Sequence, residues 1–320
     1  MRKLLAMLLW LASATALAQD WPAKPVHVVV PYPPGGGHDF ASRVVAQRLS
    51  EVLRQQFVVV NRTGASGTIG AEYTAKSAPD GYTFMVASPA ETVVGPFAGL
   101  QMNYDWEKDL APVTVIGETP LAIAVHPSVP AKTIQELLAY AKANPGKLSY
   151  GTPGSGSTMH FAGESLKAIA GIFIVHIPYR GAGPAVADLL GGQVPAGIMG
   201  LPPVVAPHKA GKLRILAVTS EKRSGTLPDV PAMAELPGFA GYNFTNWTGV
   251  FMAAKTPPGV IARLAAEIGK IVKEPAIRDK LISAGVDPLG LPTVEVVKFL
   301  AREKETYAKI AKARNIKADD

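Results

Sequence analysis

The chain begins its folded part with short apolar runs that alternate with segments of helical periodicity. The runs are rich in β-branched residues and are bounded by proline, glycine or asparagine, as buried parallel strands are: Val26–Val30, Phe57–Val60 and Tyr82–Ala87. Between the first two, apolar residues recur every three or four positions and predict an amphipathic helix: Ala41, Val45, Leu49 and Val52. Such alternation of strand and helix is typical of a βαβ sheet, so the pattern predicts an α/β fold.

A second set of alternating elements follows. The apolar runs predict strands at Leu121–Val125, Leu148–Gly151, Phe173–Ile177, Val194–Met199, Leu213–Thr219 and Trp247–Met252. Helices are expected at Thr133–Ala143, from Ser157 or Thr158 onward, at Pro184–Leu190 and at Pro202–Ala210. Two sheets in 320 residues predict two domains, each a βα sheet with helices on both faces.

The C-terminal part predicts helices without a sheet of their own. Thr256 and Pro257 suit the cap and first position of one helix. The final helix has an apolar face formed by Val296, Phe299, Leu300, Tyr307 and Ile310. We expect these helices to return to the first domain, so that the chain crosses between domains near 121–126 and near 243–251. The predicted division is 19–122 with 247–320 for domain 1 and 123–246 for domain 2.

Residues 1–18 have the pattern of a cleavable secretory signal peptide. Arg2 and Lys3 precede an apolar segment, and Ala16-Leu17-Ala18 provides a small-residue cleavage site. The chain contains no cysteine, which excludes disulfides, a thiol nucleophile and a lipid-modified cysteine. We therefore expect a soluble protein of the periplasm without a lipid anchor.

Charge and motifs exclude several function classes. The formal net charge of +7 is scattered, and an exported protein meets little nucleic acid, so we expect no nucleic-acid partner. The six histidines stand apart without metal-ligand spacing, and we predict neither a metal nor a cofactor. Short signatures of serine hydrolases, β-lactamases and zinc proteases are absent from the sequence, so we predict that the protein is not an enzyme.

Glycine-rich loops follow two of the predicted strands. The first loop runs from Pro31 to Gly37 and lacks the lysine of a phosphate-binding P-loop. The second, Gly154–Thr158, also ends at a predicted helix N-terminus, where free N–H groups and the helix dipole favour an anion. Ser88–Glu91 follows the third strand, so it should converge with the first loop at the carboxyl edge of one sheet.

The ordered set of these segments resembles a known family. VVVPYPPGGGHDFASRVVAQRLSE, VVVNRTGASGTIGAEYTAKSAPDGYTFMVAS, GKLSYGTPGSGSTMHFAGESLKAIAG, VHIPYRGAGPAVADLLGGQV and WTGVFMAAKTPPGVIARL are similar, in family order, to segments of the Bug or tctC-type periplasmic receptors of tripartite tricarboxylate transporters. The resemblance implies a two-domain Venus-flytrap of the type II periplasmic binding proteins. It also implies that the two loops hold a carboxylate ligand, the first through main-chain groups and the second with Ser155, Ser157 and Thr158 as hydroxyl donors.

Together, the loop chemistry and the resemblance predict these ligand-binding residues: Tyr32, Pro33, Pro34, Gly35, Gly36, Gly37, Asp39, Ser88, Pro89, Ala90, Gly154, Ser155, Gly156, Ser157, Thr158, His160 and Arg180. Glu91 would repel a carboxylate, so we expect it to face outward or to meet a donor on the ligand. Where the family usually has acidic residues, this chain has Pro195 and Gly200, which argues against an amine ligand.

Several of these residues have a second interpretation. Asp39 suits a helix cap as well as a ligand contact. His38 and His160 lie beside the loops, where a histidine is often structural. Arg180 could pair with a carboxylate in a bidentate manner or serve only at the surface. Tyr32 and Phe97 could line a cleft or belong to the core.

The sequence thus predicts a periplasmic receptor, expected to be a monomer, that captures a small mono- or dicarboxylate by domain closure. The expected partner is the permease of a tripartite tricarboxylate transporter; a membrane sensor kinase is the alternative.

Overall fold

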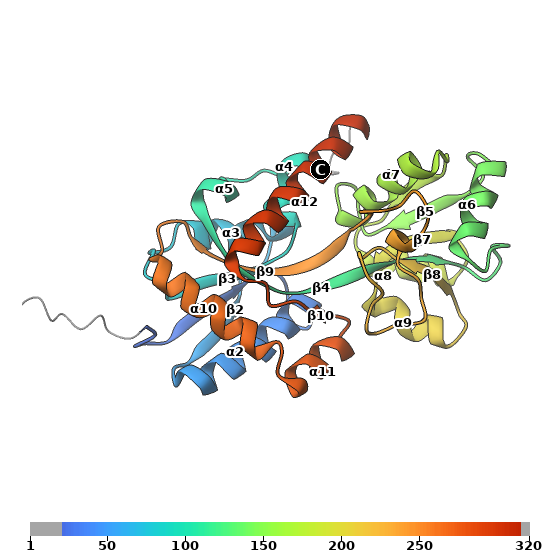
Figure 1. Cartoon of the computed structure of the whole chain (residues 1–320). Coiled ribbons are helices and arrows are strands. Elements are labelled where there is room, and N and C mark those ends of the chain that lie inside the picture. Colours follow the sequence, from blue (N-terminus) through green and yellow to red (C-terminus); the bar gives the residue numbers. More distant parts are fainter. Residues whose placement is uncertain (1–20, 315–320) are drawn as a thin grey trace, which may run out of the picture.

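The structure, a computed structural model, describes residues 21–314 as two α/β lobes (Figure 1). In the first lobe, β1 (Val26–Val30) pairs in parallel with β2 (Phe57–Asn61) and β3 (Thr83–Ala87). The helical segments of this part are α2 (Gly37–Leu53), η1 (Ala65–Gly67), α3 (Thr68–Ala75), η2 (Ala90–Val94), α4 (Gly95–Ala98) and α5 (Trp106–Asp109). The expected βαβ alternation is confirmed, with strand ends displaced by one residue.

The second lobe repeats this architecture. Here β5 (Ser149–Thr152) pairs in parallel with β6 (Val175–Pro178) and β7 (Ala196–Gly200). The remaining elements are α6 (Ile134–Ala143), α7 (Thr158–Ala170), α8 (Ala182–Leu190), α9 (Pro202–Lys209), β8 (Arg214–Val218) and η3 (Met233–Glu235). The helix α7 begins at Thr158, one of the two predicted starts, and Ser157 is its N-cap: the Ser157 side chain accepts from the backbone N–H of His160.

Two long strands join the lobes: β4 (Leu110–Val125) and β9 (Thr245–Ala253) (Figure 1). β4 pairs with β9 along Leu110–Pro120, and from Leu121 onward it pairs with β7 and β8. The hydrogen-bonded order is β2-β1-β3-β9-β4-β7-β5-β6, with β8 and β10 also on β4. Both lobes therefore share one continuous path of strands, and the two-domain α/β prediction is confirmed.

The sequence pattern identified only the last part of β4. The strand begins at Leu110, whereas the pattern placed its start at Leu121. The prediction missed the first part because Pro112, Gly117 and Pro120 interrupt the apolar alternation there. The pairing with β9 accommodates these residues by shifting register between Pro112 and Thr114 and between Val115 and Gly117. Proline and glycine here mark irregularities inside a long strand, whereas the pattern interpreted them as its boundary.

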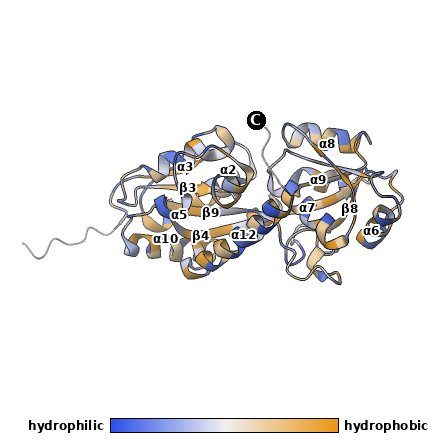
Figure 2. Ribbon diagram, turned by 90° about the horizontal axis from the view of Figure 1, so that it is seen from above, coloured by the Kyte–Doolittle hydropathy of each residue, from blue (hydrophilic) through white to orange (hydrophobic). Residues whose placement is uncertain are grey.

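The C-terminal helices pack mainly on the first lobe. They are α10 (Pro258–Ile271), α11 (Pro275–Ser283) and α12 (Thr293–Arg314), with the short β10 (Asp287–Pro288) between the last two. α10 packs on α2 and β4, whereas α12 contacts β4 and η2 and also α7 of the second lobe. Figure 2 shows the apolar strands at the centre of each lobe, with amphipathic helices around them.

The start of α10 differs slightly from the prediction. It lies one residue later than predicted: Pro257 is the N-cap and Pro258 the first helical residue. Thr256 does not cap the helix because its hydroxyl donates to the carbonyl of Ala253. The predicted signal peptide, residues 1–18, lies outside the described residues. No helix among residues 21–314 is long and apolar enough to cross a membrane.

Candidate functional site

The loop after β1, residues 33–37, is exposed and leaves open space beside its glycines. Gly35 has φ +90°, a backbone conformation that favours glycine, and no atom lies within 4 Å of where its Cβ would be. The position of a Cβ atom is also unobstructed at Gly37, the first residue of α2. The helix has no side-chain cap, because its N-cap is Gly36. The loop is therefore exposed, and the binding of a ligand by its main-chain groups stays a prediction.

Asp39 holds this loop from behind. Its carboxylate accepts from the backbone N–H of Gly35 at 3.0 Å, from Arg43 at 2.9 and 3.0 Å and from Asn61 at 2.8 Å, and the residue is 2% exposed. Burial alone would raise its pKa, but these hydrogen bonds keep the pKa below the usual value. Asp39 is the third residue of α2 and accepts from Gly35, which precedes the helix, so the interpretation of Asp39 as the helix cap is wrong. Its oxygens are already used by the protein.

The segment after β3 converges with the first loop, as expected, but its polar side chains point into the lobe. Ser88 is 2% exposed, and its Oγ lies 2.6 Å from Tyr32 Oη and 2.6 Å from Glu91 Oε2. Glu91 is 0% exposed, which corrects the expectation that it faces outward or meets the ligand. Burial raises its pKa to about 7. Pro89 is buried and Ala90 half-buried.

His38 joins the first loop to the strand that connects the lobes. Its Nδ1 lies 3.0 Å from Thr248 Oγ1 of β9, and its ring stacks on Tyr32 with centroids 5.1 Å apart. Burial lowers the pKa of His38 to about 4, so the ring is neutral at physiological pH. The structural interpretation of this histidine is therefore the one the geometry favours. Phe97 is half-buried and packs against the core.

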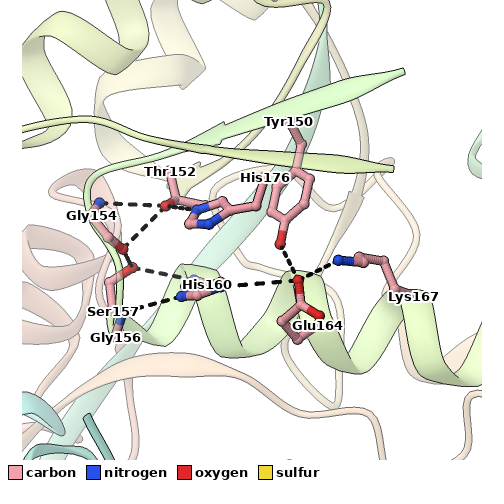
Figure 3. A network of polar contacts seen from close by, with 9 residues as sticks. All are labelled: Tyr150, Thr152, Gly154, Gly156, Ser157, His160, Glu164, Lys167 and His176. Atoms are coloured by element: carbon pink, nitrogen blue, oxygen red, sulfur yellow. Dashed lines mark hydrogen bonds and ion pairs between the residues drawn. The ribbon is translucent and has the colours of Figure 1, made fainter. Parts of the chain in front are cut away.

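The loop after β5 is bound internally by hydrogen bonds (Figure 3). The hydroxyl of Ser157 donates to the carbonyl of Gly154 at 2.7 Å and accepts from the N–H of His160. Thr152 Oγ1 donates to the same carbonyl at 3.2 Å. The N–H of Gly156 donates to His160 Nδ1 at 3.1 Å. These bonds fix the predicted anion loop before any ligand arrives.

Two of the predicted hydroxyl donors are poorly placed for a ligand. Ser157 uses its proton on Gly154, and Thr158 is only 6% exposed. Ser155 is half-buried, and it remains the hydroxyl of this loop most available to a ligand. The N-terminus of α7 and its helix dipole also favour an anion beside this loop, whose binding of a carboxylate stays a prediction.

A polar network lies beside the second loop and supports it (Figure 3). The ring of His160 stacks on that of His176, with centroids 3.9 Å apart and an interplanar angle of 16°. His176 Nε2 lies 2.7 Å from Thr152 Oγ1. Glu164 Oε1 lies 4.0 Å from His160 Nε2 and accepts from Lys167 at 2.6 Å and Tyr150 at 3.1 Å. His160 thus positions the loop, while its proposed contact with a ligand stays a prediction.

Arg180 lies beside the second loop. The N–H of its neighbour Gly181 donates to the carbonyl of Pro153 at 2.8 Å, so the start of α8 adjoins the start of the loop. The Arg180 side chain is exposed and makes no hydrogen bond or ion pair within residues 21–314. Gly181, the N-cap of α8, has no capping side chain. A guanidinium and an uncapped helix end are therefore available next to the predicted carboxylate loop.

Sequence reasoning missed the residues that hold the loops. Asn61, Thr152, His176 and Thr248 all support a loop through a hydrogen bond, yet none lies within a loop. The position of Asn61 and Thr152 at strand ends is a local signal that could have indicated them. His176 and Thr248 give no such signal. Within the described part of the chain, no group of three or more histidine or acidic residues could hold a metal ion.

The chain is similar to proteins of known class over almost its whole length. The Bordetella pertussis protein BugT is 36% identical over 306 residues, which cover 95% of this chain and 94% of that protein. The structure of R. palustris Rpa4515 with adipate is 34% identical, with a TM-score of 0.79, and covers 93% of this chain and 99% of that chain.

A second solved structure, MatC from Rhodopseudomonas palustris with bound malate, is 26% identical, with a TM-score of 0.72, and covers 91% of this chain and 100% of that chain. Residues 41–316 match the family model described as tripartite tricarboxylate transporter family receptor. Members of this family are periplasmic solute-binding proteins and not enzymes, as the sequence predicts, and the chain belongs to this family.

Proposed function

We propose that this protein binds a small mono- or dicarboxylate between its lobes and acts as a transport receptor in the periplasm. The loop at Gly154–Thr158 and its surroundings carry the proposal. Three hydrogen bonds that involve side chains hold this loop in place before any ligand binds, and the loop lies at a helix N-terminus. An exposed guanidinium, Arg180, lies beside it without an intramolecular partner in the described range. Such a set of donors suits a carboxylate.

Two relatives support the choice of ligand class. Rpa4515 was solved with adipate and MatC with malate. Adipate and malate are both carboxylates with two acid groups. Two acid groups suit two loops, because each loop can take one end of the ligand. The residues at the two ends of β7 carry no negative charge: Pro195 precedes the strand and Gly200 ends it. Their neutrality favours an anionic ligand over an amine.

Closure of the lobes would complete the site. β4 and β9 connect the lobes, and we propose that they bend when the ligand joins Pro33–Gly37 to Gly154–Thr158. The moving parts are then 19–122 with 247–320 on one side and 123–246 on the other. The closed form is the state that the permease of a tripartite transporter would recognise, because only a bound ligand stabilises it.

Calorimetric titration with adipate and malate tests the proposal. Gly37→Ala places a methyl group in the open space of the first loop at a helical position, where alanine costs no backbone strain. We expect the variant to fold with unchanged or slightly higher stability and to bind at least about tenfold more weakly, the equivalent of ~1.4 kcal/mol. Gly259→Ala is the matched control, since Gly259 also lies in the first turn of a helix with open space beside it.

The proposal fails if neither dicarboxylate nor a monocarboxylate such as acetate binds to folded protein. It also fails if Gly37→Ala and Gly259→Ala bind a carboxylate equally well, because the ligand would then not contact the first loop. Conversion of any of these compounds by the pure protein would indicate an enzyme instead.

A further inference from the structure

Three oxygen atoms form a closed triangle beneath the first loop. Tyr32 Oη, Ser88 Oγ and Glu91 Oε2 lie 2.6 Å from one another along every edge. Tyr32 follows β1, while Ser88 and Glu91 follow β3, so the triangle joins the carboxyl ends of two neighbouring strands. All three separations are those of short hydrogen bonds between hydroxyl-type oxygens.

Counting hydrogen atoms shows what the triangle requires. Each edge needs one hydrogen atom between its two oxygens, so three edges need three. The hydroxyls of Tyr32 and Ser88 supply two. The third must come from the carboxyl group of Glu91. The other carboxyl oxygen, Oε1, accepts from the backbone N–H of Ser88 at 2.7 Å, so the proton belongs on Oε2.

The surroundings favour the neutral carboxyl group. Glu91 is 0% exposed, and a Cβ added to Gly67 would lie 3.0 Å from the carboxyl group, so η1 closes the remaining side. Among residues 21–314 no lysine or arginine forms an ion pair with Glu91, and burial raises the pKa of this carboxyl group to about 7. The geometry and the burial thus agree that the group holds a proton up to neutral pH.

Other titratable groups face the triangle without neutralising it. Tyr104 donates to the backbone carbonyl of Glu91 at 2.5 Å, and Tyr32 stacks on His38, which is neutral near pH 7. Burial and the charges of Glu91 and Glu72 all raise the pKa of Tyr104, so Glu72 faces Tyr104 and not the triangle itself. α12 packs on η2, but its buried carboxyl Glu303 accepts from Trp247 on β9 instead. The groups nearest to Glu91 are therefore hydroxyls.

The triangle is mechanically joined to the loop that faces the ligand. Tyr32 directly precedes Pro33, its ring stacks on His38 at the other end of the loop, and its carbonyl accepts from Asn61 at 2.8 Å. Loss of the Glu91 proton removes one edge of the triangle. It also leaves a negative charge beneath a loop whose proposed ligand is an anion, and the two charges repel each other.

We propose that Glu91 is a proton-binding site linked to ligand binding: the carboxylate-bound protein keeps Glu91 protonated, and ionisation of Glu91 weakens binding. The inference rests on the proposed function, since it assumes that the ligand is an anion at the first loop. The protein then binds its ligand more tightly as the pH falls from alkaline to neutral, and it takes up a proton when it binds above neutral pH.

Calorimetry with adipate between pH 6.5 and 8.5, in buffers of different ionisation enthalpy, measures both effects. Over this range the carboxyl groups of adipate are ionised. We expect the affinity to fall up to about twentyfold from pH 6.5 to 8.5, and a fraction of a proton to be taken up per ligand at pH 7.5. Glu91→Gln, which stays neutral, should keep its affinity at pH 8.5 and lose the proton uptake. Glu51→Gln, an exposed residue on α2, is the matched control and should behave as the wild type.

Three results would overturn the proposal. Binding of adipate without proton uptake would show that Glu91 is not linked to the ligand. Proton uptake that persists in Glu91→Gln would assign the effect to another group. If no carboxylate binds at any pH, the proposed function fails, and a ¹³C NMR titration of the Glu91 carboxyl group still decides the proton site. A midpoint at the ordinary value of a glutamate, near 4.5, would then refute it.

Discussion

The two loops that follow β1 and β5 are similar in sequence but are held in place differently. The loop at Gly154–Thr158 is bound to itself: Ser157 and Thr152 donate to Gly154, and Gly156 donates to His160. The loop at Pro33–Gly37 has one matching bond, from the N–H of Gly35 to Asp39, which is the third residue of α2 as His160 is of α7. It has no hydroxyl of its own that donates to its carbonyls, and its other anchor is the oxygen triangle at Tyr32.

This difference suggests a division of labour. Donors that are fixed before binding lose little conformational freedom when the ligand arrives, so the second loop can supply most of the affinity. The first loop offers glycine backbone and open space, so we propose that it selects ligands by shape. Its support contains the carboxyl group of Glu91, with a pKa of about 7, so we propose that this loop is the one that responds to pH.

The largest effect is expected from exchanging the carboxyl group beneath each loop for an amide. The pKa of Glu91 is near 4.5 in the unfolded chain and about 7 in the folded protein, so ionisation of Glu91 lowers the free energy of unfolding. This loss is absent below pH 4.5, grows between pH 4.5 and 7 and is constant above pH 7. Glu91→Gln should therefore gain stability relative to wild type by up to about 3 kcal/mol between pH 4.5 and 8. Urea unfolding across this range measures the gain.

Glu164→Gln should have the opposite sign, because it leaves the largely buried ammonium of Lys167 without its carboxylate. We expect a loss on the order of 2 kcal/mol at pH 7. Stability changes of the same sign in both variants at pH 8 would contradict the proposed difference between the two supports.

Removal of the free guanidinium comes next in size. Arg180→Gln should weaken dicarboxylate binding by about 2 kcal/mol, roughly thirtyfold, because a charge-assisted hydrogen bond is lost. The melting temperature should not change, since the side chain is exposed and has no partner in the described residues. Arg278→Gln on α11 removes the same charge from a distant site and should leave binding unchanged. Equal weakening in both variants would point to net charge alone.

The two histidines that follow the loops provide a matched pair. His160→Phe keeps an aromatic ring on His176 but removes the acceptor for Gly156, so we expect about tenfold weaker binding, near 1.4 kcal/mol. His38→Phe keeps the stack on Tyr32 and loses only the bond to Thr248. We expect less than about threefold weaker binding there. The comparison fails if calorimetry finds the larger loss in His38→Phe.

The smallest effect concerns the helix cap. Ser157→Ala should lower stability by about 1 kcal/mol, because it removes the cap of α7, and it should also weaken binding a few-fold by loosening Gly154. Thr133→Ala removes the corresponding cap of α6 in the same lobe and should lower stability equally without changing affinity. Thermal unfolding and calorimetry on both variants separate the two roles of Ser157. Unchanged affinity in Ser157→Ala would remove the case for a preformed second loop.

Local patterns in the sequence were enough for the lobes and the loops. β-branched runs, helical spacing and the Ser157 cap depend on neighbours a few residues apart, so their elements could be predicted to within a few positions. The same patterns gave the wrong start for β4, because Pro112 and Gly117 are tolerated only where β9 shifts its register. Whether a proline ends a strand or bends it depends on the partner strand.

The supports of the site were decided by the tertiary structure alone. Glu91 follows β3 in a segment expected to face outward or the ligand, but Tyr32 and Gly67 approach it from other parts of the chain and help to exclude water from it. His160 and His176 become a stack because β6 lies beside β5, and Arg180 stands by the second loop for the same reason. The sequence determines where backbone donors occur, since that requires only local conformation. Burial and charge at those donors depend on contacts between distant residues, which form only when the sheets assemble.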